Sequence, residues 1–212
     1  MHEKRDYMRQ NHKIPWLAQF VMKDAWFCKP GDEKCLYLSF DDGPHPEFTP
    51  AILELLNKFE AKATFFCLGE NVVKYPEVYK SILADGHTVG NHLHHHLSAF
   101  KSNRIEYLAS AKEASLHIDS KLLRPPYGSI SPYLYRKLKK EYQLVFWDVM
   151  PGDFVDGITS DKLIENSINN IKPGSIVVFH DRFIAQPNLL PALESILSYY
   201  SNLGFKFCAI SK

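Results

Sequence analysis

Short runs of apolar residues alternate along the chain with longer stretches in which apolar residues recur every three or four positions. The short runs have the length of buried β-strands, and there are seven of them: 35–40, 62–68, 87–91, 121–124, 143–149, 175–180 and 205–210. This alternation predicts an α/β fold with a parallel sheet covered by helices. Periodicity leaves open whether the sheet closes into a barrel or stays open and doubly wound. In both cases we expect the ligand site at the carboxyl ends of the strands.

Five stretches between the apolar runs have the period of an amphipathic helix: 49–59, 75–86, 131–142, 160–171 and 189–200. In the first, we expect Thr49 to cap the helix and Pro50 to take the first helical position. In the second, Gly86 is a common C-terminal stop. The third begins with a Ser-Pro pair, which is a frequent helix start.

The composition indicates a single domain and gives no sign of a polyanionic partner. The chain has 212 residues, of which 45% are hydrophobic, enough for a single sizeable core. It carries 25 Lys+Arg against 24 Asp+Glu, with no long block of either sign. We therefore expect neither a nucleic acid nor a membrane surface as its partner. The sequence does not determine the oligomeric state.

The cysteines and the N-terminal segment bear on where the protein works. Cys67 and Cys208 lie within apolar runs and there is no CxxC pair, so we expect all four cysteines to be free, with a Cys28–Cys35 disulfide as the alternative. The charged N-terminal segment, whose apolar run is interrupted by Gln19, resembles neither a signal peptide nor a membrane span. Cytoplasm is the default expectation, and an exported form that lacks its leader is the alternative.

Two adjacent carboxylates follow the first predicted strand. Asp41 and Asp42 come directly after Phe40, and Gly43-Pro44 then turns the chain. An Asp-rich turn is the simplest interpretation. A metal ion gives the pair a chemical purpose, because one carboxylate can bind the ion while the other accepts a proton.

Four histidines fall within five positions after the third predicted strand: His92, His94, His95 and His96. On a helical turn, His92 and His96 would share one face and reach one ion. Imidazole and carboxylate are ligands that zinc accepts readily, so these two histidines together with the Asp pair predict a metal site. His94 and His95 would point elsewhere, and we interpret them as solvated loop residues.

Polar residues also lie at the ends of the fourth, fifth and sixth predicted strands. Arg124 precedes two prolines that stiffen the local backbone, and its predicted partners are the carboxylates after the first strand. His180 follows a fully apolar run, where a working residue is expected, although a core histidine is the simpler alternative. The carboxylates that could orient it are Asp148, Asp153 and Asp181.

Five segments in this order resemble the five motifs of the NodB-like polysaccharide deacetylases, carbohydrate esterase family 4. They cover roughly residues 36 to 182 and read SFDDGPHP, GNHLHHHL, RPPYG, WDVMPGDF and VVFHD. The resemblance implies a deformed barrel of about seven parallel strands and a metal-dependent hydrolysis of N-acetyl groups on an amino sugar, oligosaccharide or glycan. It further implies a deacetylase domain over 35–212, with residues 1–34 as an N-terminal extension packed on the barrel.

The resemblance also implies roles for individual residues. The metal ligands would be Asp42, His92 and His96. The ion would be one divalent cation, with Zn²⁺ favoured and Co²⁺ or Ni²⁺ as alternatives. Asp41 would be the catalytic base, held by Arg124. His180 would be the general acid, tuned by Asp153.

The remaining implied roles concern the oxyanion and the acetyl group. The backbone amide of Tyr127 would help to stabilise the oxyanion. The pocket for the acetyl methyl group would involve Tyr127, Trp147, Phe154 and Val178.

The chain departs from the family pattern at three positions. Leu93 stands where the family has Ser or Thr, so a hydrogen bond that braces the histidine loop is expected to be missing. Met150 replaces an acid and Phe154 replaces a Trp, which weakens inference about the substrate.

An amidase acting on a small non-sugar amide and a non-catalytic carbohydrate-binding protein are the alternative functions. A binder would need neither Asp41 nor His180.

Overall fold

The computed structural model describes residues 16–29, 31, 34–182 and 188–211. The first fifteen residues of the predicted N-terminal extension therefore lie outside the described residues. Every apolar run predicted as a strand contains one in the structure. Their bounds are β1 Cys35–Asp41, β2 Ala63–Cys67, β3 Thr88–Asn91, β4 Leu122–Leu123, β5 Gln143–Leu144, β6 Ile176–His180 and β7 Lys206–Phe207.

The strands form one parallel sheet that curls into a deformed half-barrel. The order is β5-β4-β3-β2-β1-β6, and β7 pairs with the beginning of β1. The segment that follows β5 reaches β6 through a parallel bridge between Val149 and Val177, where the amide of Val178 donates to the carbonyl of Val149 at 3.0 Å. This narrow seam brings the two ends of the strand order together, and the barrel implied by the motifs is confirmed.

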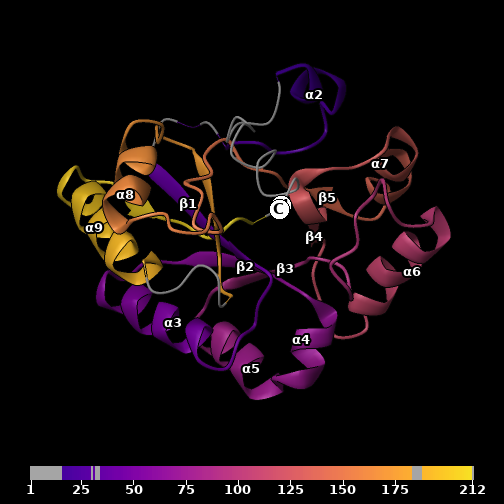
Figure 1. The fold of residues 1–212 in the computed structure, drawn as a ribbon, viewed down its shortest axis with the longest axis horizontal. Helices are drawn as coiled ribbons and strands as arrows, with labels where there is room; N and C mark the ends of the chain where they lie inside the picture. Colours follow the sequence, from indigo (N-terminus) through magenta and orange to yellow (C-terminus); the bar gives the residue numbers. More distant parts are fainter. Residues whose placement is uncertain (1–15, 30, 32–33, 183–187, 212) are drawn as a thin grey trace.

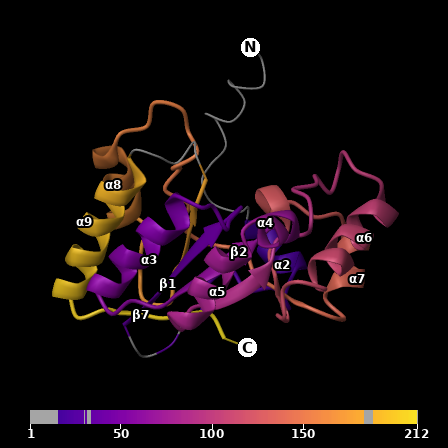
Figure 2. The same cartoon turned by 90° about the horizontal axis from the view of Figure 1, so that it is seen from below.

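Helices lie around the outside of the sheet (Figure 1). Their bounds are α2 Trp16–Val21, α3 Phe48–Lys58, α4 Gly69–Lys74, α5 Pro76–Ala84, α6 Arg104–Ala114, α7 Pro132–Leu138, α8 Ser160–Ile168 and α9 Leu189–Asn202, with a short 3₁₀ turn η1 at Pro126–Gly128. Figures 1 and 2 both place α8 and α9 at one side of the sheet and α6 and α7 at the other. All five predicted helices are present. The sequence analysis missed α2, α4 and α6.

The predicted role of Thr49 as a helix cap is wrong. Helix α3 already begins at Phe48, and its N-cap residue is Glu47. The Thr49 hydroxyl instead accepts a hydrogen bond from the amide of His45 at 2.8 Å and donates one to the buried Asp181 at 2.5 Å. Thr49 thus helps to fix the turn after β1, beneath the site. Ser131 does cap its helix, because its hydroxyl accepts from the amide of Leu134.

Buried apolar side chains form three clusters. The largest packs β1, β2 and β6 against α3 and α9. A second packs α6 and α7 around β4 and β5, and it includes Ala25 and Phe27 from the segment before β1. The third contains Phe66, Trp147 and Val178. Burial of these side chains is the main favourable term in folding.

The prediction that all four cysteines are free is wrong. Cys35 at the start of β1 forms a disulfide with Cys208, while Cys28 and Cys67 are free, so the alternative Cys28–Cys35 pair is also wrong. The cause is tertiary, since Cys35 pairs in register with Lys206 of β7 and this brings Cys208 alongside. The disulfide joins residues 173 positions apart and fastens the last strand to the first.

We expect Cys208→Ser to lower the free energy of unfolding by about 2–4 kcal/mol, because a cross-link across so long a loop restricts the unfolded chain. Urea unfolding of the oxidised protein measures this loss, and Cys28→Ser serves as the control because Cys28 is free. Reducing agent should destabilise the parent protein and leave Cys208→Ser unchanged. Equal stability of Cys208→Ser and the parent under oxidising conditions would contradict the disulfide.

Candidate metal centre and acid–base residues

The carboxyl end of β1 carries both adjacent aspartates. Asp41 is the last residue of β1 and pairs in register with His180 of β6. Asp42 follows with a left-handed backbone, φ 81°. A Cβ atom at Gly43 would collide with the carboxylate of Asp181. Only glycine therefore fits after the two aspartates.

Asp42, His92 and His96 form a cluster of metal-ligand type, here called the metal cluster. One ligand atom from each lies within 4.8 Å of the others. The Nδ1 atom of His92 is 2.8 Å from the carbonyl oxygen of Arg124, and its Nε2 atom faces Asp42 Oδ1 at 3.5 Å. A backbone carbonyl that binds one imidazole nitrogen leaves the other with a free lone pair, as in many zinc sites. The Nε2 atom of His96 lies 3.3 Å from the same carboxylate oxygen.

The carboxylate of Asp42 has the environment expected of a metal ligand. Both of its oxygens are buried, and neither has a hydrogen-bond partner in the described part of the chain, although Arg182 Nη1 lies 3.1 Å from Oδ2 as an ion pair. Burial alone would raise the pKa of Asp42, yet the adjacent His92 imidazole and the charge of His180 hold it well below its usual range. A buried, ionised carboxylate beside two imidazoles fits a divalent cation.

The histidine loop, residues 92–96, is not the helical turn that the spacing suggested. It is irregular, and the fully buried Leu93 adopts a left-handed backbone with φ 68°. The amide of Leu93 donates to Asn91 Oδ1 at 2.7 Å. This hydrogen bond braces the start of the loop, while the hydroxyl contact that Leu93 cannot make stays a prediction. His92 and His96 come together through this turn and not through a helical period.

Asp41 forms a fully buried ion pair with Arg124. The Nη1 atom of Arg124 is 2.7 Å from Asp41 Oδ1 and 2.8 Å from the hydroxyl of Ser39. The remaining guanidinium nitrogens donate to the carbonyls of Val145 and Phe146. A buried arginine is tolerable only with such a full set of acceptors. Asp41 is therefore held in one orientation.

His180 and Asp153 form a second buried pair of titratable residues. The Nδ1 atom of His180 lies 2.9 Å from Asp153 Oδ1, and its backbone amide donates to Asp153 Oδ2 at 2.6 Å. Burial disfavours the charged imidazolium, but the charge of Asp153 and its hydrogen bond outweigh this and raise the pKa of His180 to about 9. This environment favours the protonated imidazole, which is the form that a general acid would need.

The residues implied for the oxyanion and the methyl pocket border this centre. Tyr127 has a left-handed backbone, φ 60°, and its ring centroid lies 4.3 Å from that of His96. Trp147 packs so closely on Gly128 that a Cβ there would collide with the indole. Val178 is fully buried two residues before His180, on the same face of β6, and Phe154 meets the His180 ring edge-on at 5.3 Å. Their roles in catalysis stay predictions.

Two of the three candidate orienting carboxylates serve elsewhere. Asp148 accepts hydrogen bonds from the hydroxyl of Ser175 and the amide of Ile176, so it fixes the seam of the barrel. Asp181 accepts from Thr49, and burial raises its pKa to about 8.

The interpretation of His94 as a solvated residue is wrong, since its side chain is only 12% exposed, whereas His95 is 55% exposed.

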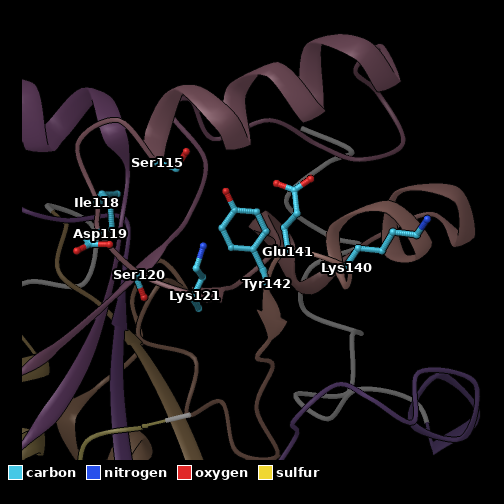
Figure 3. A pocket seen from close by; sticks show the side chains of 8 residues that line it. All are labelled: Ser115, Ile118, Asp119, Ser120, Lys121, Lys140, Glu141 and Tyr142. Carbon is cyan, nitrogen blue, oxygen red and sulfur yellow. The ribbon is translucent and has the colours of Figure 1, made fainter.

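A cavity of about 550 Å³ lies at the amino ends of β4 and β5, away from the metal cluster. Figure 3 shows Lys121 and Tyr142 bordering it, with the side chain of Lys140 extending away from Ile118. None of the predicted site residues lines it. The predicted site residues lie at the carboxyl ends of the strands, so these ends and not this pocket mark the candidate site.

Comparisons with known proteins agree with the motifs. A family model described as polysaccharide deacetylase matches residues 29–147. A peptidoglycan-N-acetylglucosamine deacetylase of Bacillus cereus is 34% identical, and the match covers 86% of this chain and 89% of that protein. A chitooligosaccharide deacetylase of Azorhizobium caulinodans is 35% identical over 71% of this chain and 75% of its own length.

A solved structure has the same fold. The crystal structure of a peptidoglycan N-acetylglucosamine deacetylase superposes with a TM-score of 0.86 at 31% identity, covering 93% of this chain and 95% of that one. Within the described residues, no helix of this protein is long and apolar enough to cross a bilayer.

We expect Arg124→Gln to lower the free energy of unfolding by about 3–5 kcal/mol, because it leaves the buried Asp41 carboxylate without its countercharge. Chemical denaturation measures the loss. Arg136→Gln, an exposed arginine on α7, is the control and should change stability little. If Arg124→Gln were as stable as the control, Arg124 would not hold Asp41.

Proposed function

The chain belongs to the polysaccharide deacetylase family, and on that basis we propose that it removes the acetyl group from N-acetylglucosamine residues of a glycan. The protein is a hydrolase of the N-acetyl groups of sugars, as its relatives are. A peptidoglycan-N-acetylglucosamine deacetylase and a chitooligosaccharide deacetylase are among its relatives, and N-acetylglucosamine is the sugar that these two have in common. The observation that carries the proposal is that Asp41 and His180 pair in register on neighbouring strands, directly beside Asp42 of the metal cluster.

The family is divalent-metal dependent, and we propose that Asp42, His92 and His96 hold Zn²⁺. The donor set of one carboxylate and two imidazoles supports this choice. A bound cation of this kind would polarise the acetyl carbonyl and activate the attacking water. Co²⁺ and Ni²⁺ accept the same donors.

Asp41 is the base in this proposal. Arg124 binds its Oδ1 atom, which leaves Oδ2 to take a proton from the attacking water. The water oxygen bonds to the acetyl carbon, and the carbonyl oxygen becomes an oxyanion. The left-handed backbone at Tyr127 supports a role for its amide as a donor to that oxyanion.

His180 is the general acid in this proposal. The C–N bond of the tetrahedral intermediate breaks as its nitrogen leaves, and an unprotonated amide anion is a poor leaving group. His180 gives its proton to this nitrogen, so the products are acetate and a free amine. Asp153 supports the step by favouring the protonated imidazole before the reaction.

The disulfide supports a proposal about location. Structural disulfides persist in oxidising compartments and are rare in the cytosol of mesophiles. The Cys35–Cys208 bond therefore favours a protein that works outside the cytoplasm, against the default expectation from the N-terminal segment. Glycans of the cell surface are accessible there.

We expect the protein to release acetate from chitooligosaccharides or from peptidoglycan, and to stop when a chelator removes the metal. Asp41→Asn and His180→Ala should each lower kcat at least about 100-fold, since each removes one proton-transfer step. Enzymatic quantification of acetate is the measurement. Release from a small non-sugar amide alone would favour the amidase alternative. A metal-replete protein inactive on every substrate would support the non-catalytic alternative.

We expect Asp153→Asn to move the alkaline limb of the pH–rate profile to lower pH by about one to two units, because the pKa of His180 falls when its charged partner is lost. The acid must be protonated, so activity is lost at a lower pH in the variant. The pH dependence of kcat/KM in metal-replete protein measures the shift. Asp161→Asn, which changes a carboxylate in the first turn of α8, is the control. If the alkaline limb stayed at the same pH in Asp153→Asn, His180 would not be the group whose deprotonation causes the loss of activity.

A further inference from the structure

We propose that His94, His95 and Glu113 form a second binding site for a divalent transition-metal cation, on the side of the histidine loop that faces α6. One ligand atom from each of the three residues lies within 4.8 Å of the others. None of them belongs to the metal cluster. Two imidazoles and a carboxylate are a donor set that Zn²⁺, Ni²⁺ and Cu²⁺ accept, whereas Ca²⁺ and Mg²⁺ prefer oxygen ligands.

The backbone beneath the second site is already fixed. The hydroxyl of Ser110 on α6 accepts hydrogen bonds from the amides of His94 and His95 at 3.0 and 3.1 Å. On the other side of the loop, the amide of Glu70 at the start of α4 donates to the carbonyl of His94. The loop is thus tied to two helices, which reduces the entropy that a ligand would have to remove.

His94 is held with one nitrogen toward Glu113. Its Nδ1 atom packs against Gly69, where a Cβ would lie only 2.5 Å away, and this atom has no hydrogen-bond partner among the described residues. Its Nε2 atom lies 3.4 Å from Glu113 Oε1. A mostly buried imidazole that faces a carboxylate across this distance is poised to share a cation with it.

His95 has the outer partner that metal-binding histidines usually have. Its Nδ1 atom lies 3.0 Å from the carboxylate of Glu70, an arrangement that orients an imidazole and increases its basicity. With Glu113, this carboxylate supplies two negative charges to balance a dication. The rings of His94 and His95 stand at 86° with centroids 4.7 Å apart.

A further histidine lies close by. His117 is in the turn that follows the end of α6, and its ring centroid is 6.0 Å from that of His94. The side chains of His95 and Glu113 are 55% and 51% exposed, so a cation has direct access from solvent. The same exposure predicts weaker binding than at the buried metal cluster. A bound ion would join the histidine loop to the end of α6.

Calorimetric titration of the metal-free protein with Zn²⁺ tests the proposal. We expect the parent to bind a tight and a weaker equivalent. His92→Ala/His96→Ala should remove the tight one and keep the weaker. His95→Gln/Glu113→Gln, which changes two exposed side chains, should remove the weaker one and keep the tight. Glu70→Gln should weaken the second site about tenfold, through loss of the carboxylate that orients His95.

Glu106→Gln, an exposed glutamate two turns earlier on α6, is the control and should change neither equivalent. Near-UV circular dichroism of each variant checks that the fold is kept. The proposal is overturned if the parent binds one equivalent that disappears in His92→Ala/His96→Ala and persists in His95→Gln/Glu113→Gln. It is also overturned if the weaker equivalent survives in the latter variant. Neither result depends on deacetylase activity.

Discussion

Both the barrel and the site depend on the hydrogen bonds and the ion pair that the buried guanidinium of Arg124 makes. It pairs with Asp41 and Ser39 on β1 and donates to two carbonyls just after β5, so its hydrogen bonds cross the interior of the half-barrel. The ring of Phe66 lies 4.1 Å from its central carbon. The carbonyl of Arg124 itself binds His92. One residue therefore satisfies its own buried charge, orients the proposed base and fixes the tautomer of a proposed metal ligand.

Much of the fold follows from the sequence because it is a matter of local pattern. The strands were predicted because fully buried parallel strands read as apolar runs, and long helices such as α3 and α9 because their apolar stripes are regular. Helix α4 has six residues and is too short to show a period. Helix α6 buries mainly small or polar-tipped residues, such as Ser110 and Ala111, and so lacks an apolar stripe. The disulfide needed the register of β7 on β1, which no local pattern contains.

The candidate site was predictable as a set of residues and not as a geometry. Parallel strands place their carboxyl ends at one rim, which is why Asp41, Arg124 and His180 could be expected to meet. The choice of Asp153 over Asp148 and Asp181 could not be made from position, since all three lie close to strand ends. The structure distinguishes them by their partners, because Asp153 contacts His180 whereas Asp148 and Asp181 accept hydrogen bonds from other residues. The proposed second metal site on the histidine loop was missed because His94 was interpreted as a polar loop residue. The space that Gly69 leaves for its ring could not be foreseen from the sequence.

The left-handed residues of the rim bear on how this enzyme can diversify. Asp42, Leu93 and Tyr127 all have positive φ, which disfavours most side chains and β-branched ones above all. Sequence change at these positions is restricted both by the chemistry of the site and by the backbone conformation. Met150 and Phe154 are free of that second restriction. Sequence change at those two positions is accordingly compatible with the backbone in more ways than change in the turns that carry Asp42, Leu93 and Tyr127.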